Sequence, residues 1–206
     1  MEVVYVGSSK VAVLPVVRGL VSEERKVESN FNKWTPGSVA LSISKEELEA
    51  LKQFKDEGAE LETFEEEVYV SRLSEFGEVR KPPPCFHKAV KLCTENEIEC
   101  VGVDMTEVEY TDAYCHFVST FEVMRASWFK KRLQSDSLKS ETPEEFVLKF
   151  DQTVNKSKGF QELEKEREKV IAHKIWKMAK TQNKIMAVIE LERSDGVLSE
   201  LKKKRR

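Results

Sequence analysis

The sequence predicts an α/β protein: a mostly parallel sheet of about four or more strands, flanked by helices, with a long helical segment between the last two strands. Two observations lead to this fold class. Short, continuous apolar runs of the kind found in strands buried on both faces occur several times along the chain. Between them lie longer segments in which apolar residues recur every three or four positions, and several of these segments open with a helix-capping motif.

The chain begins with a predicted strand at Val3–Val6, an apolar run that ends at Gly7. A glycine here lets the backbone turn sharply. We expect a helix to follow, capped by Ser8 or Ser9, with Pro15 in its first turns. The buried stripe of this helix comprises Val13, Val16, Val17 and Leu20.

A second strand and helix follow the turn at Pro36-Gly37. Residues Val39–Ile43 form the predicted strand, and Ser44-Lys45-Glu46-Glu47 is a capping box, in which the serine and the second glutamate satisfy each other's backbone amides. The helix that it opens continues to Gly58. Its apolar face comprises Leu48, Leu51 and Phe54.

The stretch from Glu60 to Lys81 has a weaker pattern. The segment "ELETFEEEVYVSRL" fits either a helix or an acidic approach to a short strand. Pro82-Pro83-Pro84 then forces an extended break. We therefore expect residues 58–84 to be an insertion or a linker within a single α/β domain that spans residues 1–206.

A helix is predicted after the prolines, and its apolar face comprises Phe86, Ala89, Val90 and Cys93. The strand Cys100–Val103 and a turn at Asp104-Met105 come next. Thr106-Glu107-Val108-Glu109 is another capping box. It opens what the pattern predicts as the longest helix of the chain.

Aromatic and apolar residues recur along that helix at alternating steps of four and three positions. They are Tyr110, Tyr114, Phe117, Phe121, Met124 and Trp128. A seam this regular is typical of a core face or of a dimer interface. The sequence leaves both roles open, and we expect a homodimer.

The last part of the chain carries three more predicted helices and one strand. Thr142-Pro143-Glu144-Glu145 combines a capping box with proline at the first helical position. A further helix covers Phe160–Lys180, the last strand covers Lys184–Ile189, and a closing helix covers Gly196–Leu201. The basic tail at residues 202–206 complements the dipole at the end of that helix.

Composition and charge exclude several classes of function. The chain has 206 residues and a formal net charge of −3, so as a whole it has no electrostatic footprint for nucleic acid. Its longest uninterrupted apolar run, Val11–Val17, is too short to cross a bilayer, and its start does not resemble a signal peptide. We therefore expect a cytoplasmic protein without a membrane partner. Association of nucleic acid with the basic tail is a lesser alternative.

The cysteines do not predict a metal site. There are four of them, without any C-x-x-C pair. Cys115 and His116 are neighbours, but adjacent side chains on a helix point about 100° apart, which makes joint ligation awkward. We expect reduced thiols, no metal and no cofactor.

Four stretches, in this order, carry a family resemblance. "YVGSSKV" looks like a first strand with a Gly-x-x-His turn, and "PGSVALSISKEELEAL" like a Pro-Asp-x-Val-x-x-Glu-Leu strand and helix. "AVKLCTENEIECVGVDM" is similar to a helix and strand that end in Asp-Arg. "EKEREKVIAHKIWKMAKTQNKIMAVIELERSDGV" is similar to a stretch from Glu-Arg-Asp through a strand to a second Gly-x-x-His and a glycine. The chain thus resembles the TraB family, relatives of the Tiki proteins within the erythromycin-esterase-like and ChaN-like superfamily, over most of its length outside residues 58–84.

Both histidines of that family pattern are missing. Lys10 stands in place of the first, and Glu190-Leu191-Glu192-Arg193 stands in place of the second Gly-x-x-His. Ser42 replaces an acidic residue, and Met105 replaces the arginine after Asp104. The residues that survive are Gly7, Asp104, Gly196, the pair Glu166-Arg167, and Arg125 with Trp128.

The resemblance implies metal-dependent proteolysis in the Tiki branch and a histidine base in the esterase branch. Neither chemistry transfers to this chain. A metal needs neutral imidazole or carboxylate ligands, and a general base needs a pKa near the working pH, whereas lysine and arginine are normally protonated.

A ligand site is expected where the parallel strands end. Ligands of open α/β sheets bind beyond the carboxyl ends of the strands. We expect Gly7, Ser8, Ser9, Lys10 and Arg193 to gather there with Asp104. Two cations would favour a phosphate or carboxylate ligand. Alternatively, Lys10 and Arg193 pair with Glu190, Glu192 or Asp104 and fill an abandoned site.

The expected function is therefore that of a noncatalytic interaction or scaffold protein that binds a small anion. The alternative is a divalent-cation-dependent hydrolase with a rebuilt site, in which Asp104, Glu190 and Glu192 are the candidate catalytic residues.

Overall fold

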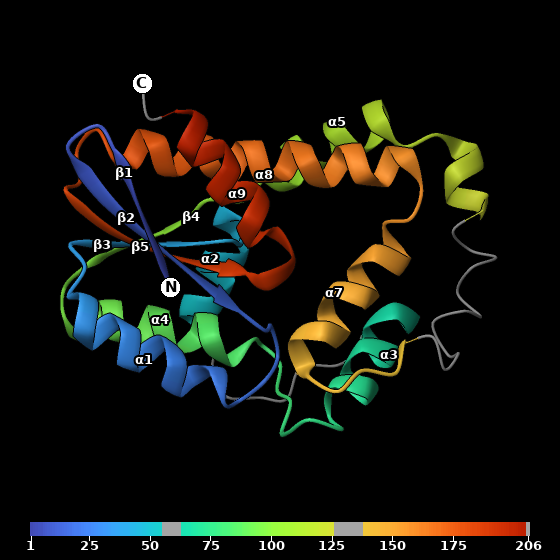
Figure 1. The fold of residues 1–206 in the computed structure, drawn as a ribbon, viewed down its shortest axis with the longest axis horizontal. Helices are drawn as coiled ribbons and strands as arrows, with labels where there is room; N and C mark the ends of the chain where they lie inside the picture. Colours follow the sequence, from blue (N-terminus) through green and yellow to red (C-terminus); the bar gives the residue numbers. More distant parts are fainter. Residues whose placement is uncertain (55–62, 126–137, 205–206) are drawn as a thin grey trace.

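The computed structural model describes residues 1–54, 63–125 and 138–204 and has the predicted α/β architecture (Figure 1). Five strands form one sheet in the order β1-β2-β5-β3-β4. The strands are β1 (Glu2–Val6), β2 (Ser9–Val16), β3 (Ser38–Leu41), β4 (Glu99–Gly102) and β5 (Lys184–Glu190). All neighbouring pairs are parallel except β1 and β2.

The first helix predicted from the sequence is a strand instead. Val6 pairs with Ser9, so Gly7 and Ser8 form a two-residue hairpin turn, with Gly7 at a φ of 59° as its first residue. The apolar residues of the expected helix lie in or just beyond β2. Pro15 is tolerated there because β1 begins opposite Val13, so the described part of β1 does not pair with β2 at Pro15.

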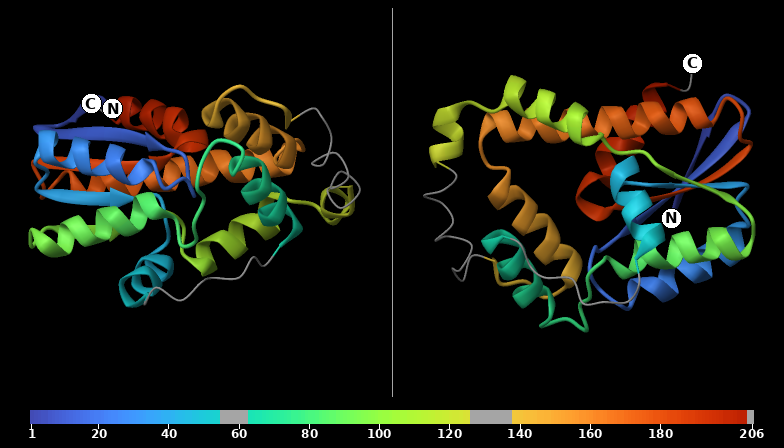
Figure 2. Two further views of the ribbon diagram at one scale, coloured as in Figure 1. Left: turned by 90° about the horizontal axis from the view of Figure 1, so that it is seen from below. Right: turned by 180° about the vertical axis from the view of Figure 1, so that it is seen from behind.

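Helices cover both faces of the sheet, as the two further views in Figure 2 also show. On one face lie α1 (Glu23–Trp34) and α4 (Pro84–Glu95), which pack against each other. On the other face lie α8 (Lys158–Met178) and α9 (Leu191–Lys203). The helix α2 (Lys45–Gln53) opens with the predicted capping box and packs near α4 and β4. The helix α1 was not predicted from the sequence.

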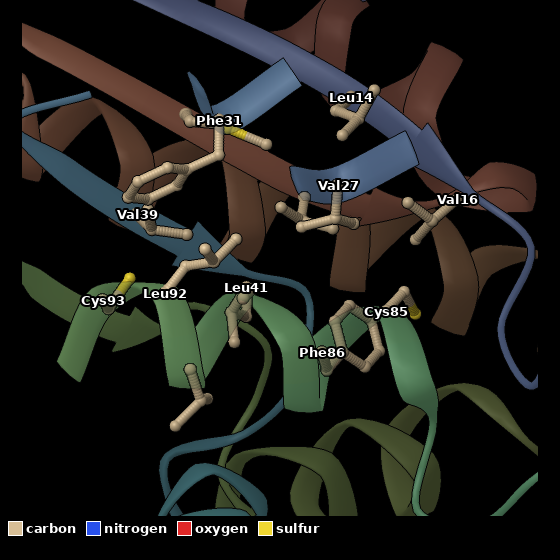
Figure 3. Packing of buried hydrophobic residues seen from close by; sticks show 14 of the residues in the cluster. Leu14, Val16, Val27, Phe31, Val39, Leu41, Cys85, Phe86, Leu92 and Cys93 are labelled. Carbon is tan, nitrogen blue, oxygen red and sulfur yellow. The ribbon is translucent and has the colours of Figure 1, made fainter. Parts of the chain in front are cut away.

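Alternating residues of each central strand point to opposite cores. Leu14 and Val16 of β2 belong to the core under α1 and α4, whereas Val11 and Val13 belong to the core under α8 and α9. Figure 3 shows the first of these cores, in which Phe31 and Phe86 lie over the sheet. Burial on both faces explains why these strands are apolar throughout.

Most of the described residues between β4 and β5 are helical, as predicted. The helices there include α5 (Glu107–Phe117), α7 (Pro143–Val154) and α8. Thr142 caps α7, but Glu145 accepts from the amide of Glu141 rather than from that of Thr142, so only half of the predicted capping box forms. The segment after α2 also contains a helix, α3 (Phe64–Leu73), which packs against α7.

The predicted long aromatic helix is interrupted. α5 ends at Phe117, Val118 is extended, and residues 120–125 are helical again. Tyr114 packs against Phe160 of α8, with ring centroids 5.9 Å apart, whereas Phe121 and Met124 are exposed. The last member of the seam, Trp128, lies outside the described residues. Of the described helices, α8 is the longest, with 21 residues.

Within the described part of the chain, no helix combines the length and the apolar character that crossing a membrane would need.

Candidate functional site

The carboxyl ends of β2, β3, β4 and β5 meet at one edge of the sheet because these strands are parallel. A charged cluster occupies this edge, and we call it the strand-end cluster. It consists of Arg18, Asp104, Glu164, Arg167, Glu190, Glu192 and Arg193. Three of these residues follow β2 or β4 or end β5, two lie in the first turn of α9, and two come from α8.

Arg193 lies at the centre of the cluster. α9 begins directly after β5, so its first turn carries the Arg193 side chain back over the end of the strand. The guanidinium pairs with Glu190, with Glu192 at 3.2 Å and with Glu164 at 2.7 Å. Burial opposes the charged form, but Glu190, Glu164 and Glu192 outweigh it and hold the pKa of Arg193 well above its ordinary value.

Glu190 is buried, with 3% of its side chain exposed, and is held between two arginines. Besides Arg193, it pairs with Arg18 at 3.2 Å. Burial favours the neutral acid, but Arg193 and Arg18 overcome that effect and lower the pKa of Glu190. Its backbone amide donates to Ser42 Oγ at 2.9 Å, which ties the end of β5 to the end of β3.

Asp104, the candidate residue after β4, also accepts hydrogen bonds at both carboxylate oxygens. One carboxylate oxygen accepts from Arg167 Nη2 at 2.5 Å, and the other accepts from the Met105 amide at 2.7 Å. Arg167 reaches on to Glu164 at 3.2 Å and so joins Asp104 to the rest of the cluster. Glu166, which precedes Arg167 in the surviving pair, instead faces outward to Lys169.

Three carboxyl groups at this edge have raised pKa values. Burial, followed by the neighbouring Glu190, raises the pKa of Glu192 to about 7. Burial also raises the pKa of Glu168 to about 7, with smaller contributions from Glu164 and Asp151. Asp151, on α7, has a raised pKa for which burial is again the main cause. The described residues of this region therefore contain more acids than the arginines Arg18, Arg167 and Arg193 neutralise.

A cavity of about 480 Å³ opens beside the strand-end cluster. It lies between the ends of β2 and β5 and the helices α3, α7 and α8, and we call it the main cavity. Its lining includes the cluster residues Arg18, Glu164, Glu192 and Arg193, the acid Asp151, and the rings of Tyr69, Tyr110, Phe150 and Phe160. A smaller cavity of about 250 Å³ is lined by Asp104 and Arg167, among other residues.

Four of the predicted ligand residues lie at the wrong end of the sheet. Gly7 and Ser8 form the hairpin turn, and Ser9 and Lys10 begin β2, whereas Arg193 lies beyond the end of β5. The prediction that they gather with Asp104 was wrong, because the run after Gly7 is a strand that carries the chain back across the sheet. Ser9 instead donates to the carbonyl of Ala179 at 2.7 Å, and Lys10 lies over the ring of Tyr5.

The remaining candidate residues do lie close together, as predicted. Asp104, Glu190, Glu192 and Arg193 come together at the strand ends, and Arg193 pairs with Glu190 and Glu192, as the alternative of a filled site expects.

Several residues of the site were missed, above all Arg18 and Glu164. The signal for Arg18 was present, because a charged residue that directly follows an apolar run such as Val11–Val17 marks the end of a buried strand. Glu164 and Glu168 are four residues apart on α8, on the side of the helix that also buries Leu163 and Ile171. Acids on such a face point to partners in the interior.

The described residues contain no group of three or more His, Cys, Asp or Glu side chains placed to hold a metal ion. The carboxylates of the strand-end cluster face arginines instead.

The chain was compared with models of protein families and with curated proteins, and neither comparison gave a match. The resemblance to the TraB family therefore remains a proposal.

Proposed function

We propose that this chain is a noncatalytic binding protein, a divergent relative of the TraB family, and that the main cavity is its binding site. One observation carries the proposal. The acids expected to perform chemistry are held by arginines, while a cavity of about 480 Å³ lies beside them. That volume is within the range of small-molecule sites, and the lining combines aromatic rings with a few polar groups, as such sites do.

The surroundings of the candidate acids do not favour catalysis. A general base needs a lone pair that the substrate can reach. Asp104 lines the smaller cavity, but its carboxylate is paired with Arg167, and Glu190 is buried between Arg193 and Arg18. Arginine at these positions remains protonated and cannot serve as a base.

Thermal unfolding tests the proposal. A panel of small cations, anions and neutral compounds is screened, because a ligand that binds only the native state raises its stability by mass action. At about 100 times its Kd, a ligand of the wild type should raise Tm by roughly 5–10 °C. Val70→Trp, which places a large ring in the lining of the main cavity, should abolish the shift. Val108→Trp, at an exposed position on α5, is the matched control and should keep it. A shift that survives Val70→Trp would place binding elsewhere.

The alternative is a divalent-cation-dependent hydrolase, and Glu192 is the observation in its favour. An acid with a pKa of about 7 beside a cavity is suited to proton transfer. However, Glu192 shares the guanidinium of Arg193 with Glu190 and Glu164, so a protein cation already occupies the place that a divalent cation would need among these acids. We expect no turnover of ester, phosphate ester or peptide substrates with Mg²⁺ or Mn²⁺. Metal-dependent turnover that Glu192→Gln abolishes would establish the hydrolase instead.

The positions of the charged residues do not favour the anionic ligand expected from the sequence. Lys10 lies at the other end of the sheet, and the charge of Arg193 is already matched by Glu190, Glu192 and Glu164. We therefore expect the cationic compounds of the panel to raise Tm more than the anionic ones.

A further inference from the structure

The charges that line the main cavity are unevenly paired. Its cationic side chains are Arg18, Arg80, Lys81 and Arg193. Each has a carboxylate partner: Glu190 for Arg18, Glu78 for Arg80, Glu66 for Lys81, and three glutamates for Arg193. Two of those partners, Glu190 and Glu78, do not line the cavity. Every cation of the lining is thus paired, and part of that neutralisation comes from Glu190 and Glu78 outside the cavity.

The acids of the lining are less well matched. Asp151 accepts a hydrogen bond from Asn155 at 2.8 Å, and in the described part of the chain it has no ion-pair partner. Glu192 shares Arg193 with Glu190 and Glu164, and its second oxygen is buried without a hydrogen-bond partner among the described residues. A half-buried carboxylate such as Asp151, or a buried carboxylate oxygen without a hydrogen-bond partner such as that of Glu192, can recover part of its desolvation cost by binding a proton or a cation.

The apolar part of the lining also suits a cation. Tyr69, Tyr110, Phe150 and Phe160 contribute rings to the cavity. The negative faces of such rings attract ammonium groups, most strongly where water is excluded. Arg167 already lies over the Tyr110 ring, 5.6 Å from its centroid, so this part of the molecule contains one such contact.

We propose that the main cavity binds a small organic amine: an ammonium group placed at Asp151 and Glu192, with an apolar or aromatic body against the rings of α3, α7 and α8. This inference rests on the proposed function, because it assigns a ligand class to the same cavity. It reverses the charge of the ligand expected from the sequence.

Three compounds that differ only in one polar group test the proposal by calorimetry. They are 3-phenylpropylamine, 3-phenylpropan-1-ol and 3-phenylpropanoate. The amine should bind at least about tenfold more tightly than the alcohol, and the carboxylate should bind most weakly, because one desolvated ion pair or cation–π contact is worth about a factor of ten in affinity.

Substitutions then locate the ammonium group. Asp151→Asn should weaken binding of the amine by about tenfold and leave the alcohol unchanged. Glu192→Gln serves as a second variant should Asp151→Asn fold poorly. Glu144→Gln, which removes an exposed acid from the same helix α7, is the matched control and should change neither affinity.

The outcomes separate this inference from the proposed function. Tighter binding of the carboxylate or the alcohol that Val70→Trp abolishes would overturn the amine and keep the cavity as a binding site. Amine binding that is unchanged in both acid variants would also overturn the inference. Failure of all three compounds to bind would count against the inference and the proposed function together.

Discussion

Glu192 lies beside Glu190 in a region from which water is largely excluded, and only 11% of its side chain is exposed. Two ionised carboxylates this close repel each other, so Arg193 cannot fully stabilise both. As a result, the two glutamates differ in their protonation near neutral pH. Glu190 has a lowered pKa and remains ionised, whereas Glu192 has a pKa of about 7 and gains a proton near neutral pH.

The raised pKa of Glu192 predicts that the protein becomes less stable as the pH rises from 5 to 8. The folded-state pKa of Glu192 is about 7, above the ordinary value of 4.5, so the native state binds the extra proton in this window. Glu168, also with a pKa of about 7, contributes with the same sign. The free energy of unfolding should fall by on the order of 2 kcal/mol, measured by denaturant unfolding at several pH values.

Glu192→Gln mimics the protonated acid and should therefore raise stability at pH 8 and flatten the pH dependence. Glu144→Gln, an exposed control, should follow the wild type. A Glu192→Gln variant that is less stable than the wild type at pH 8 would show that Arg193 needs the ionised carboxylate, contrary to this account.

At the scale of the elements, Gly102 fixes the end of β4 against the segment that leads into α2. A Cβ atom at this position would lie 2.5 Å from the carbonyl oxygen of Ser44 and 2.9 Å from that of Ile43. Both contacts are with backbone, which cannot move aside as a flexible side chain would. The close approach also places Asp104, two residues later, where its amide donates to the Ile43 carbonyl.

Gly102→Ala should therefore destabilise the protein by about 2 kcal/mol or more, because the backbone of β4 or of residues 43–44 has to shift. The matched control is Gly37→Ala, where the added Cβ would meet its nearest neighbour at an ordinary 3.6 Å. Denaturant unfolding of both variants measures the difference. Equal stability of the two would contradict the close packing described here.

The elements that could be predicted from sequence are those with a local chemical signal. The capping boxes at Ser44 and Thr106 form as predicted, and β5 appears at the predicted residues because its apolar run is short and bounded by lysine and glutamate. The hairpin was missed because Gly7-Ser8 between two β-favouring runs also resembles a strand ending at a helix cap. That single error displaced Lys10 from the predicted site.

The candidate site was only partly predictable, because its residues come together through the sheet order. Asp104, Glu190, Glu192 and Arg193 adjoin strand ends that the apolar runs mark. Arg167 and Glu164 enter from α8, and their pairing with Asp104 and Arg193 depends on how that helix crosses the sheet. No pattern in one segment encodes such a crossing.

At the scale of the whole molecule, a third apolar cluster includes Leu73 of α3 and Phe146 of α7. Figure 2 shows these two helices beyond one end of the sheet. This pair of helices closes one side of the main cavity, while the strand-end cluster closes another. Tyr69 of α3 donates to the carbonyl of Arg18 at 2.9 Å and so connects the two parts. The proposed binding site therefore depends on α3, which lies in the segment 58–84 that was predicted to be an insertion or a linker.

The expected homodimer stays a prediction, and the exposed residues after α5 give it a test. Phe121 is 67% exposed and Met124 is 59% exposed, so an interface there would bury both. We expect the wild type to have twice the chain mass of 23.8 kDa in light scattering, and Phe121→Ser/Met124→Ser to run as a monomer. Val108→Ser, also at an exposed site, should remain dimeric. A wild type that is monomeric at tens of micromolar would exclude the dimer.

The measurement that tests the central claim most directly is a crystal structure with 3-(4-bromophenyl)propylamine, because the anomalous signal of bromine locates the ligand without assumptions about its pose. The account predicts a bromine peak inside the main cavity, among the rings of Phe150, Phe160 and Tyr69, with the ammonium group at Asp151 or Glu192. A bromine peak outside this cavity, or an ammonium group directed away from both acids, would contradict it.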